Sequence, residues 1–173
     1  VSHLANINGT LNLLNLSKAF GIKRFIFSSS SSIYGDQKRD VLTEDLMQNP
    51  MSPYALHKLT GEYYCKLFYK IYGLETISLR YFNVFGPRQD PSSQYSNLIP
   101  KFFKFAIEAL VPKINGDGHQ RRDFTFVADV VSANILASRN KNKDCLGEVF
   151  NIGSGRNISV NEVSDKILDL TSS

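Results

Sequence analysis

Apolar residues recur at helical spacing in the opening segment of the chain, which carries Leu4, Ile7, Leu11 and Leu14. This pattern predicts an amphipathic helix over residues 2–20, ended by Gly21. The apolar run that follows, residues 23–28, predicts a short buried strand. The chain therefore begins with a helix that leads into a strand.

The segments that follow continue the alternation of helices and strands. Residues 34–53 are rich in glycine, asparagine, aspartate and proline, which predicts a long loop. Ser52 as N-cap and Pro53 in the first turn predict a helix that ends before Gly73. Residues 75–81 then have the pattern of a second strand. A strand, a helix and a strand in this order form a βαβ unit, so we expect an α/β fold with a doubly wound parallel sheet.

The second half of the chain has shorter and less regular elements. Its pattern predicts helices over about 98–110, over 130–138 and after Ser159, and strands over 113–115, 121–127 and 148–152. Asp129 is a candidate N-cap, and Ser159 with Glu162 matches a capping box. We expect residues 1–85 to form one part of the fold. Residues 86–173 are expected to form a smaller portion, with some of its elements returning to the sheet.

Composition narrows the class of protein. The chain has 173 residues, 42% of them hydrophobic, and a formal net charge of +4 with both signs interspersed. These values are typical of a soluble globular protein and do not favour a nucleic-acid surface. No apolar stretch reaches 18 residues and no signal peptide is present, so we expect no membrane association and a cytoplasmic setting. Cys65 and Cys145 lack metal-ligand spacing, so no bound metal is expected.

Five consecutive serines, Ser28 to Ser32, follow the first strand, and Tyr54 and Lys58 lie four residues apart on the next helix. That spacing places both side chains on one helical face, while His57 points off it and is expected at the surface. A free tyrosine has a pKa of about 10, and a neighbouring ammonium favours the phenolate. Such a phenol can take a proton from a sugar or alcohol hydroxyl as hydride leaves the carbon. We therefore expect a hydroxyl-centred acid–base site.

Three longer segments carry a resemblance to a known family. They are Ser-Ser-Ser-Ser-Ser-Ile-Tyr-Gly at 28–35, Ser-Pro-Tyr-Ala-Leu-His-Lys at 52–58 and Arg-Tyr-Phe-Asn-Val-Phe-Gly-Pro-Arg-Gln-Asp-Pro at 80–91. The chain resembles the extended short-chain dehydrogenase/reductase family and, within it, the nucleotide-sugar 4-epimerases. The resemblance implies a partial Rossmann-type sheet. Residues 1–85 would be the C-terminal half of the NAD-binding domain, and residues 86–173 a substrate-binding portion that is incomplete at its C-terminus.

The resemblance also implies roles for individual residues. Tyr54 would be the catalytic base, Lys58 would bind the nicotinamide ribose and tune Tyr54, and Ser30 would supply a catalytic hydroxyl. The implied contacts with NAD are made by Asn6, Ser28, Tyr54, Lys58 and Tyr81. The implied contacts with a UDP-sugar are made by Ser30, Ser32, Asn83, Asn97, Leu98, Lys113, Asn115 and Arg122. The guanidinium of Arg122 would pair with the diphosphate, whose oxygens suit a bidentate partner.

The triplet Ser30-Ser31-Ser32 separates related reactions. In similar 4,6-dehydratases the matching triplet is Thr-Asp-Glu, and in similar decarboxylases a glutamate stands at the position of Ser32. Elimination needs a general acid, and this triplet has no carboxyl group. The resemblance thus favours C4 epimerization of UDP-glucose, UDP-galactose or their N-acetyl forms. Two alternatives remain open: a dehydratase or decarboxylase of the same family, and an inactive fragment that acts only as a binding module.

Two glycine clusters, at 116–118 and 153–155, complete neither G-x-G-x-x-G nor the Walker spacing, so we expect turns there. The chain then lacks the family's Gly-rich cofactor loop, and we expect it to be a piece of a longer protein. On its own it is expected to bind NAD weakly and to turn over little. The resemblance also implies a homodimer of the full-length protein, formed through the helices at 2–20 and 54–72.

Overall fold

The computed structural model describes residues 2–39, 41–92, 98–110, 114 and 116–171. The chain forms two compact units, each built from two segments of sequence. The first unit contains residues 1–82 and 131–152, and the second contains residues 83–130 and 153–173. Among the described helices, none is both long and apolar enough to cross a membrane.

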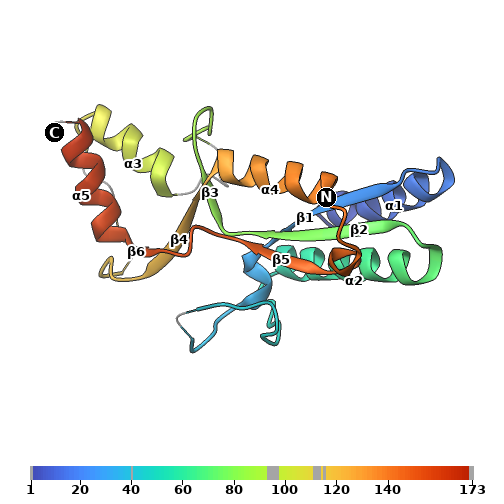
Figure 1. Cartoon of the computed structure of the whole chain (residues 1–173). Coiled ribbons are helices and arrows are strands. Elements are labelled where there is room, and N and C mark those ends of the chain that lie inside the picture. The colour runs from blue at the N-terminus through green and yellow to red at the C-terminus, as the bar shows by residue number, and fades with distance from the viewer. Residues whose placement is uncertain (1, 40, 93–97, 111–113, 115, 172–173) are drawn as a thin grey trace. The chain divides into compact units, whose positions relative to one another are not determined.

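Three parallel strands make the sheet of the first unit (Figure 1). They are β1 (Arg24–Ser30), β2 (Glu75–Tyr81) and β5 (Val149–Ile152), in the order β1-β2-β5. The register pairs Ser29 with Arg80, and Arg80 with Asn151. These three residues therefore form one row across the carboxyl ends of the strands. The expectation of an α/β fold with a parallel sheet is confirmed.

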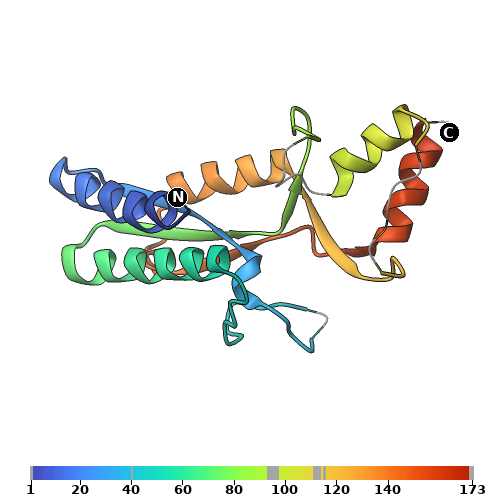
Figure 2. The ribbon, with the colours of Figure 1, turned by 180° about the vertical axis from the view of Figure 1, so that it is seen from behind.

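Helices cover both faces of this sheet (Figures 1 and 2). They are a π-helical turn η1 (Leu4–Asn8), α1 (Gly9–Ala19), α2 (Pro53–Tyr72), the part of α4 (Val127–Arg139) from residue 131 onward, and a short 3-10 turn η3 (Lys143–Cys145). On one face Leu14 of α1 and Phe68 of α2 pack with Phe27 of β1. On the other face Ala137 of α4 packs with Ile77 of β2. Each helix thus buries an apolar stripe against the strands.

Helix α2 begins and ends where the sequence predicts. The hydroxyl of Ser52 accepts a hydrogen bond from the backbone N–H of Ala55 at 3.1 Å, and Pro53 occupies the first turn. The helix ends at Gly73, whose φ of +71° lies in the left-handed region that glycine adopts without strain. These local signals place Tyr54 in the first turn of α2.

The second unit has its own sheet of β3 (Asn83–Phe85), β4 (Arg121–Phe126) and β6 (Asn157–Ser159). Strand β4 lies in the middle, parallel to β3 and antiparallel to β6. The unit also contains α3 (Leu98–Ile107) and α5 (Val160–Thr171). The capping box at the start of α5 is confirmed, because the side chains of Ser159 and Glu162 each bond the backbone N–H of the other.

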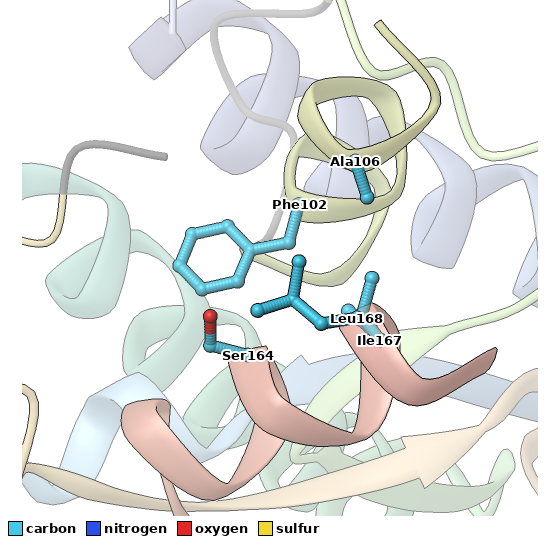
Figure 3. Close-up of a pocket in the computed structure, with 5 residues that line it drawn as sticks. All are labelled: Phe102, Ala106, Ser164, Ile167 and Leu168. Carbon is cyan, nitrogen blue, oxygen red and sulfur yellow. The ribbon is translucent and has the colours of Figure 1, made fainter. Parts of the chain in front are cut away.

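Helices α3 and α5 pack against each other to form the core of this unit. Figure 3 shows Phe102 and Ala106 of α3 facing Ser164, Ile167 and Leu168 of α5. These side chains line a cavity of about 10 Å³. Because that volume has room for about one water molecule, the cavity is too small for a sugar nucleotide.

Several predicted boundaries are wrong. The strands β3 and β6 were not expected, and Asp129 is not an N-cap, because α4 already begins at Val127. The helix predicted to reach residue 110 ends at Ile107, and Ala109 beyond it has a φ of +52°, which is incompatible with continued helix. The strand expected at 113–115 lies largely outside the described residues, and Ile114 belongs to no strand.

Candidate active site

Tyr54 and Lys58 lie on the face of α2 that reaches the end of β1. The ammonium of Lys58 donates a hydrogen bond of 2.9 Å to the backbone carbonyl of Ser28, and its nitrogen lies 5.6 Å from the centre of the Tyr54 ring. Tyr54 is 46% exposed, so its phenol remains open to a ligand. The helix therefore presents a phenol beside a tethered cation, as the four-residue spacing predicts.

The surroundings of Lys58 perturb its protonation. Burial lowers the pKa of Lys58 below its ordinary value of 10.5, because the ammonium loses part of its hydration. A charge with less water around it acts more strongly on its neighbours. The partly buried ammonium of Lys58 therefore lies beside the Tyr54 ring in a position fixed by the Ser28 carbonyl.

Two hydroxyls meet at the carboxyl ends of β1 and β2. The hydroxyl of Ser28 lies 3.1 Å from the phenol oxygen of Tyr81, which also exchanges hydrogen bonds of 2.8 and 3.0 Å with the amide of Asn134 on α4. The structure thus brings together the predicted cofactor residues Ser28, Lys58 and Tyr81. Asn134 is an addition that the sequence did not signal, because its contact depends on α4 returning to the sheet.

The remaining serines begin a 3-10 turn, η2 (Ser31–Tyr34). The hydroxyl oxygen of Ser30 accepts a hydrogen bond of 3.2 Å from the backbone N–H of Ser32, which leaves the hydroxyl proton of Ser30 available to a ligand. The hydroxyl of Ser32 is buried and has no hydrogen-bond partner among the described residues. The residues Ser30 to Ser32 thus offer a ligand the hydroxyl of Ser30, and they carry no carboxyl group.

Asn6 is held by its own helix, since its amide donates to the carbonyl and hydroxyl of Ser2 at 3.1 and 3.2 Å. The expectation that His57 lies at the surface is wrong, because its side chain is only 9% exposed. Its ring packs edge-on against that of His3, with centroids 5.4 Å apart, and its Nδ1 lies 3.4 Å from the Ser2 hydroxyl. The N-terminal turn thus covers the helical face that carries His57.

The second unit holds three of the predicted substrate residues. The guanidinium of Arg122 lies 3.4 Å from the amide oxygen of Asn83, whose amide nitrogen donates to the carbonyl of Asp123 at 2.8 Å. Leu98 is the first residue of α3 and packs against the core of this unit. Three more of the predicted substrate residues, Asn97, Lys113 and Asn115, lie outside the described residues.

A buried ion pair was not predicted. Glu62 of α2 and Arg80 of β2 are 5% and 2% exposed, and their side chains are hydrogen bonded. The sequence did contain one signal for this contact: Glu62 is four residues from Lys58, which places both side chains on the same face of the helix.

Known proteins share this fold and these elements. The NAD dependent epimerase/dehydratase family matches residues 2–153. The putative UDP-glucose 4-epimerase of Methanocaldococcus jannaschii is 41% identical over 163 residues, which are 94% of this chain and 52% of that protein. The UDP-N-acetylglucosamine 4-epimerase structure from Methanobrevibacter ruminantium has a TM-score of 0.92 at 41% identity, over 99% of this chain and 54% of that one.

A UDP-glucuronic acid 4-epimerase from Bacillus cereus, solved with UDP-glucuronic acid and NAD, matches with a TM-score of 0.89 at 34% identity. The match covers 99% of this chain and 52% of the Bacillus cereus chain. Matches also include a UDP-N-acetyl-alpha-D-glucosaminuronate decarboxylase of Bacillus cytotoxicus and a dTDP-D-glucose 4,6-dehydratase of Mus musculus, at 36% and 32% identity. Relatives of this chain thus catalyse more than one reaction.

The parallel sheet, with helices on both faces and polar groups at its carboxyl edge, defines a Rossmann-type α/β protein. This chain belongs to the NAD dependent epimerase/dehydratase family. It spans about half the length of the relatives that it matches.

The cofactor of this family is NAD. A lysine ammonium has three donors, and the bond to Ser28 uses one of those on Lys58. The remaining donors of Lys58 and the hydroxyls of Ser28 and Tyr81 suit the ribose hydroxyls and the amide in the nicotinamide-ribose half of NAD. The 173 residues contain no G-x-G-x-x-G segment, so the fit extends to that half of NAD only.

Proposed function

We propose that this chain is part of a UDP-sugar 4-epimerase in which Tyr54 moves the proton of the sugar 4-hydroxyl. The observation that carries the proposal is the tethered Lys58 beside an exposed phenol, next to a strand end with hydroxyls and no carboxyl group. The epimerase relatives agree with this chemistry.

In the proposed reaction Tyr54 accepts the proton of the 4-hydroxyl and later returns it to the same oxygen of the keto sugar. Lys58 favours the phenolate during the first step, and the hydroxyls of Ser30 and Ser32 hold the reacting oxygen. NAD, when bound, would supply the acceptor for the hydride of C4 and the donor for its return. The proton and the hydride both come back, so no atoms are gained or lost.

Substrate binding is proposed for the second unit. Arg122 uses one guanidinium nitrogen towards Asn83, which leaves its other donors for the oxygens of a diphosphate. Asn83, fixed by the carbonyl of Asp123, would hold the same ligand. Leu98, Asn97, Lys113 and Asn115 remain proposed sugar-nucleotide contacts on the basis of the family resemblance.

A dehydratase or decarboxylase is the second candidate, since relatives with those activities match the chain. Such a reaction would need another acid, because Ser30, Ser31 and Ser32 carry none. The full-length protein, supplied with NAD, should therefore be assayed with UDP-glucose, UDP-galactose and their N-acetyl forms. Interconversion at C4 is expected. Unchanged UDP-galactose together with a 4-keto-6-deoxy product would overturn the proposal.

The role of Tyr54 has its own test. Tyr54→Phe keeps the ring and removes the proton acceptor, so the rate should fall at least ~100-fold. Tyr72→Phe, on an exposed tyrosine at the other end of the same helix, is the matched control and should keep the rate. Near-normal turnover in Tyr54→Phe would refute the assignment.

We also propose that the full-length protein is a homodimer through α1 and α2. Both helices expose large apolar side chains, among them Leu13, Leu16, Tyr63, Leu67 and Ile71. For the isolated 173 residues we propose weak NAD binding and little turnover, which calorimetry tests directly. Micromolar or tighter affinity would contradict this part of the proposal.

A further inference from the structure

The ion pair between Glu62 and Arg80 is the most deeply buried pair of charges among the described residues. Two parallel hydrogen bonds join them: Arg80 Nη2 donates to Glu62 Oε2 at 2.8 Å, and Nε donates to Oε1 at 3.0 Å. The side chains of Arg80 and Glu62 are 3% and 5% exposed. A bidentate pair of this kind fixes the orientation of both groups as well as their distance.

Further buried groups complete the arrangement. The hydroxyl of Ser29 donates to Glu62, and Arg80 Nη1 donates at 2.8 Å to the phenol oxygen of Tyr34. That phenol in turn donates to the amide oxygen of Asn151 at 2.7 Å. Each charge therefore has additional partners, and the network joins α2 to all three strands of the sheet and to η2.

The protonation of these groups agrees with this arrangement. Burial raises the pKa of Tyr34, because the charged form would be poorly solvated, so its phenol keeps its proton and can donate it to Asn151. Burial alone would lower the pKa of Arg80, but the hydrogen bond and the charge of Glu62 outweigh burial and raise it. The ion pair is thus surrounded by neutral side chains, and a second carboxylate, that of Glu44, accepts from the backbone N–H of Asn151 at 2.7 Å.

Stability alone does not account for the pair. Replacing a buried ion pair with apolar side chains of similar volume is often neutral or stabilising. An apolar contact, however, would not fix the register of α2 against the strands as firmly as a bidentate bond does. The pair therefore calls for an explanation in terms of geometry.

Its location supplies that explanation. Tyr54, Lys58 and Glu62 follow at intervals of four residues and so share one stripe of α2. Glu62 is bonded to Ser29, and Lys58 is bonded to the carbonyl of Ser28, the preceding residue. The ion pair thus holds the helix one turn away from the bond that tethers Lys58.

We propose that Glu62 and Arg80 are positioning residues that hold Lys58 on the Ser28 carbonyl and thereby set Tyr54 for proton transfer. Neither residue touches the reacting atoms, and both act through α2. This inference rests on the proposed function of Tyr54, but its structural part, the placement of Lys58, can be measured without any activity.

The test is the double variant Glu62→Leu with Arg80→Met in the full-length protein. Its matched control is Arg24→Met with Glu75→Leu, which removes a partly buried ion pair of 2.7 Å at the opposite end of the same two strands. A misplacement of about 1 Å can cost ~100-fold in rate. We therefore expect kcat of the first variant to fall between about 10- and 100-fold with KM for the UDP-sugar nearly unchanged, while the control keeps its kcat.

The second readout is the pKa of Lys58, followed by NMR of protein with ¹³C-labelled lysine. In the Glu62/Arg80 variant the pKa of Lys58 should return towards 10.5, because Lys58 leaves its half-buried position. In the control variant the pKa of Lys58 should stay lowered. If the first variant does not fold, Arg80→Lys replaces it, with Arg24→Lys as its control. A lysine keeps the charge and loses the bidentate geometry.

An unchanged kcat, or equal losses in variant and control, would overturn the positioning role. An unchanged Lys58 pKa in a folded variant would do so as well. If the unaltered protein interconverts no UDP-sugar, the proposed function fails instead, and the NMR measurement still decides whether the ion pair places Lys58.

Discussion

Gly61 lies between Lys58 and Glu62 on α2 and faces the ring of Phe27 on β1. A Cβ atom built on Gly61 would collide with Cζ of Phe27 and would lie 2.8 and 3.0 Å from Cε1 and Cε2 of the same ring. The ring is 6% exposed and packs in the core with Leu14, so it has little room to move. Gly61→Ala is therefore expected to push the helix away from the strand.

The net cost follows from two opposed effects. Alanine is favoured over glycine in a helix interior by about 1 kcal/mol. Overpacking a closed core costs about 1–3 kcal/mol. Because the clash of Gly61→Ala is with a buried aromatic ring, we expect the second effect to win by about 1 kcal/mol. The displaced helix would also lengthen the 2.9 Å bond from Lys58 to Ser28, which should lower kcat by about 10-fold or more.

Denaturant unfolding and the epimerase assay of the full-length protein measure both effects. Lys66→Ala, on the exposed side of α2, is the control and should change the unfolding free energy by less than about 0.5 kcal/mol. Phe27→Leu combined with Gly61→Ala removes the colliding ring atoms, so the two changes should be strongly non-additive. The reasoning is refuted if Gly61→Ala is as stable as the unaltered protein, or if the two changes simply add.

Two further predictions concern single charged groups. Lys58→Met should change the unfolding free energy by less than about 1 kcal/mol, because removal of a poorly hydrated charge offsets the lost hydrogen bond. The kcat of this variant should fall at least ~100-fold. A stable variant with full activity would contradict the role of Lys58. The lowered pKa of Lys58 also means that the unfolded chain binds more protons, so its contribution makes stability rise with pH up to about 10.5. Ser159→Ala should cost about 1 kcal/mol in unfolding experiments through loss of the N-cap. Hydrogen bonds from Ser159 lower the pKa of Glu162 below 4.5, so their stabilisation is present above that pH and is lost as pH falls through the lowered value. Ser159→Ala keeps the backbone N–H and removes only the hydroxyl, so the share of the difference that comes from the hydroxyl's bond to the Glu162 carboxylate should be lost in acid. A difference that stays constant from pH 7 to pH 3 would contradict this account.

Features set by neighbouring residues were predictable from the sequence. The cap at Ser52, the end of α2 at Gly73 and the capping box of Ser159 and Glu162 all depend on contacts within a few residues. The strands β3 and β6 were missed, because segments of three residues become strands only by pairing with β4. Pairing of this kind joins segments far apart in the chain, and local patterns do not contain it.

The candidate site divides in the same way. The spacing of Tyr54 and Lys58 predicts that they share a face, and the structure places Lys58 beside the Tyr54 ring. The bond from Lys58 to a backbone carbonyl could not be predicted, because a carbonyl has no sequence signature. The contact of Tyr81 with Asn134 likewise needs α4 to return across the sheet, which no local pattern announces.

The ion pair of Glu62 and Arg80, in contrast, was within reach of the sequence. Arg80 lies in the predicted strand at 75–81, next to the apolar residues Ile77 and Leu79, and an arginine buried in a sheet requires an anionic or hydrogen-bonding partner. In a βαβ unit the connecting helix packs on the sheet, and Glu62 is the one acidic residue of α2. Its four-residue spacing from Lys58 then places it on the stripe that faces the strands. A charge in a buried strand, together with a single acid on the adjoining helix, therefore predicts both the pair and its connection to the proposed catalytic face.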